Sequence, residues 1–255
     1  MTDTIASARP LAREQSRYFY FYMAIACAAV AFIGFLPTYW VPMAAGAFHA
    51  APVYHLHGLL FFSWTLYFIY QTWLGASGRV VRHRDVGLLG VSLATGMIFF
   101  GVTVGIVSVK RDTAAGMGEA ARTFLIVPLS DILFFATVIL LALLNLRRAE
   151  THKRLMLLAT ISLLPAPIAR WFLTFLAPPG AANAVPPVSI ATGPVLVASL
   201  LLLVAMVHDW RSRDRPHPVY LWGFAAFIAM TLLRAPFSVT PAWQAIAAAL
   251  TGLAG

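Results

Sequence analysis

The sequence predicts an all-α membrane protein, a bundle of seven transmembrane helices, on three observations. Of its 255 residues 60% are hydrophobic and only 11% are charged, whereas water-soluble domains are near half apolar and a quarter charged. The apolar residues form long runs of about 20 residues, the length that crosses a bilayer. The basic residues gather in alternate connections between these runs. This composition excludes a water-soluble domain and a disordered chain, and the single Cys27 excludes a disulfide scaffold.

Seven runs are long and apolar enough to be predicted as spans, separated by short polar or Pro/Gly-rich connections. They cover residues 18–36, 53–76, 88–109, 124–146, 155–177, 188–207 and 219–238. Residues 1–17 are charged and precede the first span, which is expected to be an uncleaved anchor. Residues 239–255 are too short to span, and Pro241 after Thr240 predicts the start of a short helix on the outer face.

The basic residues give the expected orientation, because cytoplasmic connections are rich in Lys and Arg. With the N-terminus in the cytoplasm, 13 of the 18 basic residues lie inside, and the C-terminus lies outside. The inner set is Arg9, Arg13, Arg17, Arg79, Arg82, Arg84, Arg147, Arg148, Lys153, Arg154, Arg211, Arg213 and Arg215. The net charge of +9 is therefore attributed to the positive cytoplasmic connections of a protein in a cell inner (plasma) membrane. No nucleic-acid partner is expected.

Four ionisable side chains from four helices are expected in the outer third of the membrane: His57, Asp131, Arg170 and Arg234. Asp131 and Arg170 each lie seven residues from an outer helix end, about 10 Å deep at ~1.5 Å per residue. One interpretation is an Asp131–Arg170 ion pair that locks two helices, with Arg234 extended to the headgroups. The other is an outward-facing polar cavity, because two permanent cations face one carboxylate and the surplus charge requires an anion.

Prolines favour the cavity, because each removes a helical hydrogen bond and frees a carbonyl group, which is tolerated where helices line a polar cavity. They are Pro128, Pro165, Pro167, Pro194 and Pro236. A metal centre is not expected here, since His55 and His57 point to nearly opposite helix faces and a zinc site needs three or four ligands. An acid/base pair of Asp131 and His57 would make the chain a membrane-embedded enzyme, but no catalytic residue can be assigned.

At the inner boundary, His83 and His152 stand at matched depth on different helices. This placement suits bis-histidine ligation of haem b, with Arg84 available to a propionate. The alternative is that both are solvated side chains among the inner cations. The segments around them, His83-Arg84-Asp85-Val86-Gly87 and His152-Lys153-Arg154-Leu155-Met156, are also similar to each other, by an old duplication or by chance.

These two segments resemble uncharacterised bacterial multi-pass families in which H-R-x-x-G opens one helix and H-[KR]-x-[LW]-M another. The resemblance spans roughly residues 54–171 and implies an inner-membrane helical bundle. A fainter similarity is to diheme b-type cytochromes, whose histidines also lie at helix ends; that family needs a second histidine pair, and the outer face offers only His55 and His57.

Three functions remain open at this stage. The first is a binding or accessory protein whose outer cavity takes an anionic amphiphile, a lipid or a quinone-like molecule. The second is a haem-b redox or respiratory-assembly protein, and the third is a membrane-embedded acid/base or metal-dependent enzyme. The partners expected are the lipid bilayer, a small amphiphilic ligand, and a membrane protein or a second copy of the chain.

Overall fold

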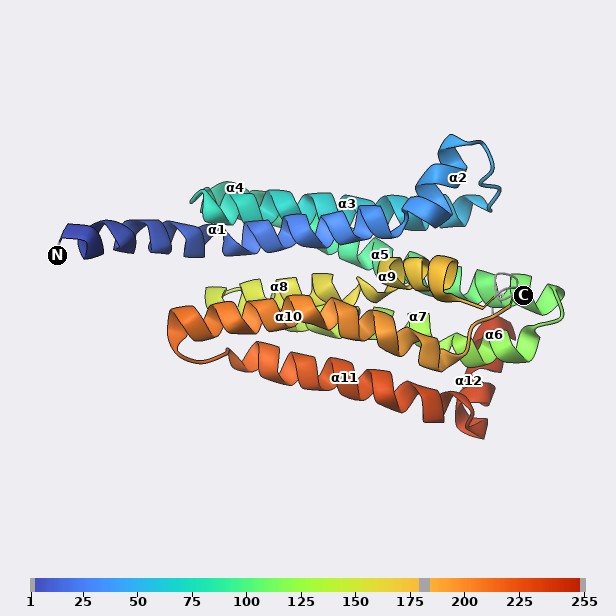
Figure 1. The fold of residues 1–255 in the computed structure, drawn as a ribbon. Helices are drawn as coiled ribbons and strands as arrows, with labels where there is room; N and C mark the ends of the chain where they lie inside the picture. The colour runs from blue at the N-terminus through green and yellow to red at the C-terminus, as the bar shows by residue number, and fades with distance from the viewer. Residues whose placement is uncertain (1–2, 179–183, 253–255) are drawn as a thin grey trace.

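The computed structural model describes residues 3–178 and 184–252, and side chains from Arg17 onward within these ranges. Within them the chain is helical, without strands (Figure 1). The long helices are α1 (Asp3–Gly34), α3 (Pro52–Ala76), α5 (Gly87–Ala114), α7 (Ile126–Leu144), α8 (Ala149–Ser162), α10 (Thr192–Arg213) and α11 (Pro218–Ser238). The shorter elements are η1 (Leu36–Trp40), α2 (Val41–Ala44), α4 (Val80–Asp85), α6 (Gly118–Phe124), α9 (Pro165–Trp171), η2 (Phe172–Leu176), η4 (Val188–Ala191) and α12 (Pro241–Gly252).

Six stretches of the described chain are long and apolar enough to cross a membrane, so the structure is that of a multi-pass membrane protein. They are Arg17–Gly34, Val80–Ala114, Gly118–Leu144, Ala149–Leu176, Val188–Arg213 and Pro218–Ser238. The remaining predicted span, residues 53–76, corresponds to α3. This helix is long enough but is not among the six apolar stretches, and histidines, tyrosines, tryptophans and Gln71 interrupt its aliphatic residues. The count of seven therefore stays a prediction.

Five helical columns close into a ring. Its members in spatial order are α1, α3, α5, α7 and the broken column α8–α9, which returns to α1. The helices α10 and α11 pack outside this ring, against α7, α8 and α9 (Figure 1).

The centre of the ring is solid in its middle layer. Trp64 is 1% exposed, and its Nε1 donates to Thr160 Oγ1 at 3.2 Å, which joins α3 to α8 across the ring. Phe135 packs edge-on against Trp64 with ring centroids 5.4 Å apart. Met97 and Leu157 are also fully buried in this cluster.

The two ends of the bundle differ in chemistry. The basic end carries α4, the α7–α8 turn and the α10–α11 turn, and holds the connections rich in arginine (left in Figure 1). The α12 end carries α2, α6, η4 and α12 (right in Figure 1). There α12 packs on α6, with Trp243 Nε1 donating to Arg122 O at 2.9 Å.

The column α8–α9 is broken in the middle. The predicted continuous span 155–177 is instead α8, a turn at Leu163 and Leu164, then α9 and η2. Pro165 stands at the first position of α9 and Pro167 follows it. Because proline has no N–H to donate, it begins a helix more readily than it continues one.

A close approach of α1 to α9 fixes the position of α9. Gly34 ends α1 against Pro167, where an added Cβ would lie 2.7 Å from the Pro167 carbonyl oxygen. That backbone cannot move aside without shifting α9. Trp171 Nε1 donates to Ile33 O at 2.9 Å and reinforces the contact.

We therefore expect Gly34→Ala to lower the stability of the bundle by about 1–3 kcal/mol, the usual cost of overpacking. Gly75→Ala is the matched control, because an added Cβ at Gly75 meets nothing within 4 Å and alanine favours the helix. Thermal unfolding of both variants in detergent checks this. Equal melting temperatures for Gly34→Ala and the parent would contradict the close packing.

Candidate functional site

The α12 end contains an intramembrane ion pair between α7 and α11. Arg234 Nη1 donates to Asp131 Oδ1 at 2.9 Å, and the side chains are 2% and 17% exposed. Within the described residues, Arg234 Nε and Nη2 are buried without a hydrogen-bond partner. The pair neutralises the carboxylate of Asp131.

This pairing corrects the expected Asp131–Arg170 ion pair. Arg234 is not extended to the headgroups but is 3% exposed and bound to Asp131. The reason lies in the packing, because α11 lies against α7, whereas α9 lies against α1 and α10. That arrangement turns Arg170 toward α1.

Arg170 is consequently the surplus cation. Its Cζ lies 5.6 Å from the centroid of the Phe35 ring, at the end of α1. Among the described residues it forms no ion pair with a carboxylate. Its side chain remains accessible although protein atoms crowd around it.

His57 of α3 belongs with Arg170. The two lie near enough for the charge of Arg170 to act on the imidazole. The His57 ring packs on Phe61 with centroids 4.1 Å apart, and its Nδ1 is buried without a partner in the part of the chain that the structure describes. No described hydrogen bond joins His57 to Asp131, so of the four predicted residues only Asp131 and Arg234 are in direct contact.

Aromatic side chains surround the Arg170 side of this site. Trp40 stacks on Phe32 at 5.7 Å and packs against Phe62 at 4.8 Å. Phe62 also packs edge-on against Phe35, which contacts Arg170. Trp40 Nε1 is a further buried donor without a partner in the described chain.

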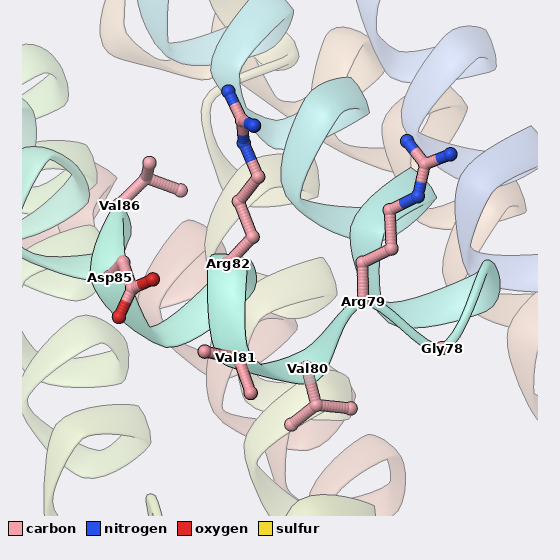
Figure 2. Close-up of a pocket in the computed structure, with 7 residues that line it drawn as sticks. All are labelled: Gly78, Arg79, Val80, Val81, Arg82, Asp85 and Val86. Atoms are coloured by element: carbon pink, nitrogen blue, oxygen red, sulfur yellow. The ribbon is translucent and has the colours of Figure 1, made fainter.

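The two surface hollows described in the structure do not include this site. One follows α4 at the basic end and is lined by residues 78–82, 85 and 86 (Figure 2). The other lies at the α12 end between α5, α6 and α12, where Lys110, Thr113, Arg122 and Thr251 line it. None of the four predicted cavity residues lines either hollow.

The basic end holds a buried ion network that the sequence analysis missed. Arg154 and Asp209 are 1% and 0% exposed. Arg154 Nε donates to Asp209 Oδ2 at 2.8 Å, and its Nη2 donates to the other carboxylate oxygen. Its Nη1 donates to Glu150 Oε2 at 2.7 Å, and Glu150 also pairs with Lys153 and Arg213.

The same carboxylate reaches the start of α11. Asp209 Oδ2 accepts from the backbone N–H of His217 at 3.1 Å, and His217 Nδ1 accepts from Val219 N at 3.2 Å, which caps the helix. Partial burial and the nearby charge of Arg154 hold the pKa of His217 below its ordinary value. His217 is therefore neutral and available as an acceptor at neutral pH.

The two inner histidines occupy equivalent positions in two helical hairpins. His83 Nδ1 lies 3.3 Å from Gln71 O near the end of α3, and His152 Nδ1 lies 3.0 Å from Ala142 O near the end of α7. A carbonyl oxygen only accepts, so Nδ1 carries the proton and Nε2 keeps a free lone pair. The two imidazoles are close enough for their charges to interact, and Arg84 acts on His83.

Among the described residues, no three His, Cys, Asp or Glu side chains gather in a group that could hold a metal ion. Comparisons of the chain with protein-family models, with curated proteins and with solved structures find no match.

A double-mutant cycle tests the assignment of charges at the α12 end. Asp131→Ala leaves Arg234 buried and uncompensated, which typically costs about 3–5 kcal/mol. We expect the double variant Asp131→Ala/Arg234→Ala to lose clearly less stability than the sum of the losses in the two single variants. In the double variant Asp131→Ala/Arg170→Ala, the two losses of stability should add to within about 0.5 kcal/mol, as they do for residues without a shared contact. Thermal unfolding in detergent measures both cycles, and a larger coupling to Arg170 than to Arg234 would refute the assignment.

Proposed function

We propose that the chain is an integral membrane binding or accessory protein that holds the polar head of an amphiphile, an anionic lipid or a quinone-like molecule, at the α12 end. Arg170 is the principal contact and His57 stands beside it. One observation carries the proposal: Arg234 already neutralises Asp131, so Arg170, an exposed residue, lacks a carboxylate partner among the described residues. Arginine does not lose its proton at this depth, so it requires an anion or water.

The surroundings of Arg170 suit the apolar part of such a ligand. Phe35, Phe62 and Trp40 provide aromatic surface beside the guanidinium. The unpartnered His57 Nδ1 and Trp40 Nε1 provide two further polar contacts in the described chain. A small number of convergent polar groups on an aromatic lining is typical of sites for small amphiphilic ligands.

We further propose seven spans in a cell inner membrane, with the N-terminus in the cytoplasm and the C-terminus outside. One observation supports the orientation and a second supports the number of spans. The connections that hold most of the basic residues meet at one end of the bundle, as the positive-inside rule requires of cytoplasmic loops (Figure 1). The seventh span would be α3, which packs between α1 and α5.

A matched pair of amphiphiles tests the site. Oleate and oleyl alcohol share a hydrocarbon chain and differ in the head charge. We expect oleate to raise the melting temperature of the detergent-purified protein more than oleyl alcohol does, and this excess to vanish in Arg170→Gln. Arg122→Gln, at the same end of the bundle, is the control and should retain the excess. Equal protection by the alcohol would exclude an anionic head group, and full protection in Arg170→Gln would exclude Arg170 as the contact and with it the proposal.

A second candidate function is a haem-b redox or respiratory-assembly protein at the basic end. The observation that favours it is the shared orientation of His83 and His152, whose Nδ1 atoms lie against carbonyl oxygens and whose Nε2 atoms have no hydrogen bond among those described. This is the tautomer in which histidine binds metals, and the chemistry of the donor set therefore fits haem. Bound haem would supply one-electron transfer, and Arg84 would be available to a propionate.

Optical spectroscopy of the purified protein tests this second candidate. A reduced-minus-oxidised spectrum with Soret and α bands is expected, and His83→Ala or His152→Ala should abolish both. His208→Ala is the control, since His208 lies at the same end and stacks on Phe19 at 3.7 Å. A parent protein reconstituted with haem that shows neither band would eliminate the candidate.

A further inference from the structure

The end of α3 and the adjoining α4 present two arginines without carboxylate partners. Arg82 Nε donates to Tyr70 OH at 2.9 Å, and Arg79 Cζ lies 4.4 Å from the centroid of the Trp73 ring. Within the described residues neither arginine forms an ion pair. The aromatic contacts therefore fix both side chains while leaving the terminal guanidinium N–H groups free to bind an anion.

The two guanidinium groups lie on one side of α4. Figure 2 shows Arg79 and Arg82 extending together along the surface hollow, while Val80 and Val81 point the opposite way. Asp85 also lines the hollow, but its carboxylate points away from both guanidinium groups (Figure 2). Arg17 of α1 adds a third cation, since its Nη2 lies beside Gly78 at the turn before α4.

An apolar strip leads away from these arginines along α3. Leu59 and Leu66 are 62% and 55% exposed, and they share a helix face with Tyr70 and Trp73 by their spacing of seven, four and three residues. From Leu59 to Trp73 the strip is about 21 Å long at ~1.5 Å per residue, close to the length of an acyl chain. Tyr and Trp below a pair of arginines mark the headgroup level of a bilayer.

We propose that Arg79 and Arg82 bind the phosphate of an anionic phospholipid, whose acyl chains lie on the Leu59–Leu66 strip. Arginine forms two parallel hydrogen bonds to a phosphate, and Trp73 and Tyr70 hold the guanidinium planes in place for this contact. A zwitterionic lipid fits less well because its headgroup carries a cation into an already cationic site. This site lies at the basic end and is separate from Arg170, so it does not depend on the proposed function.

Lipid-dependent stabilisation tests the proposal. Dioleoyl phosphatidylglycerol, dioleoyl phosphatidylcholine and glycerol 3-phosphate are titrated into the delipidated 255-residue chain, with its melting temperature as the readout. We expect phosphatidylglycerol to stabilise most. Its apparent affinity should fall roughly 25-fold in Arg79→Gln/Arg82→Gln, because each cation near an anionic lipid contributes about a fivefold preference.

Two control variants separate this site from general charge effects. Arg147→Gln/Arg148→Gln removes the same charge from exposed positions at the same end and should keep the phosphatidylglycerol response. Arg170→Gln should also keep it. An equal loss in the Arg147/Arg148 variant, or equal stabilisation by phosphatidylcholine, would overturn the proposal. Equal stabilisation by glycerol 3-phosphate would indicate a soluble phosphate and would also overturn it.

Native mass spectrometry of the parent protein provides a second measurement that does not require the variants to fold. From an equimolar mixture of the two lipids, the protein should retain phosphatidylglycerol in preference to phosphatidylcholine. Equal retention of both lipids would refute the proposed site.

Discussion

The buried ion pair between Arg154 and Asp209 organises the second half of the bundle. Both side chains are removed from solvent, so the pair is tolerated only because nearly every donor and acceptor is used. Asp209 connects α8 to α10 and, through the His217 N–H, to the first turn of α11. The α10–α11 hairpin is thereby held against the ring. Since α11 also carries Arg234, the same attachment at one end helps align the Asp131–Arg234 pair at the other end.

The two halves of the described chain differ in the kind of contact that joins their helices. The interhelical ion pairs among the described residues join α8 to α10 and α7 to α11. The contacts of α1 with α3 and of α3 with α5 depend instead on aromatic and small residues, as at Gly90, where Tyr67 occupies the space of a side chain. Arg170 belongs to α9, in the half of the chain where ion pairs join the helices, but its side chain faces Phe35 in the first half. Its described neighbours there include Phe35 and His57, and no carboxylate of the described chain forms an ion pair with it.

The helical class and most of the spans could be predicted from the sequence because hydrocarbon selects strongly for apolar runs. Depth could also be estimated from helix ends, and the estimate placed Asp131 near Arg234, with which it forms an ion pair. The partners could not be predicted, because they depend on which helices are neighbours and how each is rotated. Asp209 was assigned to a connection, although its four-residue spacing from the buried Ala205 places it on the inner face of α10. That spacing was the signal that could have revealed the Arg154–Asp209 pair.

The packed layer around Trp64 has a consequence for permeation. Trp64, Phe135, Met97 and Leu157 fill the ring between its two ends, and the hydrogen bond from Trp64 to Thr160 ties α3 to α8 through that layer. A molecule that reaches Arg170 from the α12 end therefore meets this packed layer and does not pass through it in this conformation. It must leave by the face through which it entered or sideways into the bilayer. For the proposed ligand of Arg170, exchange would therefore proceed through the α12 end or the bilayer, and not through the bundle to the basic end.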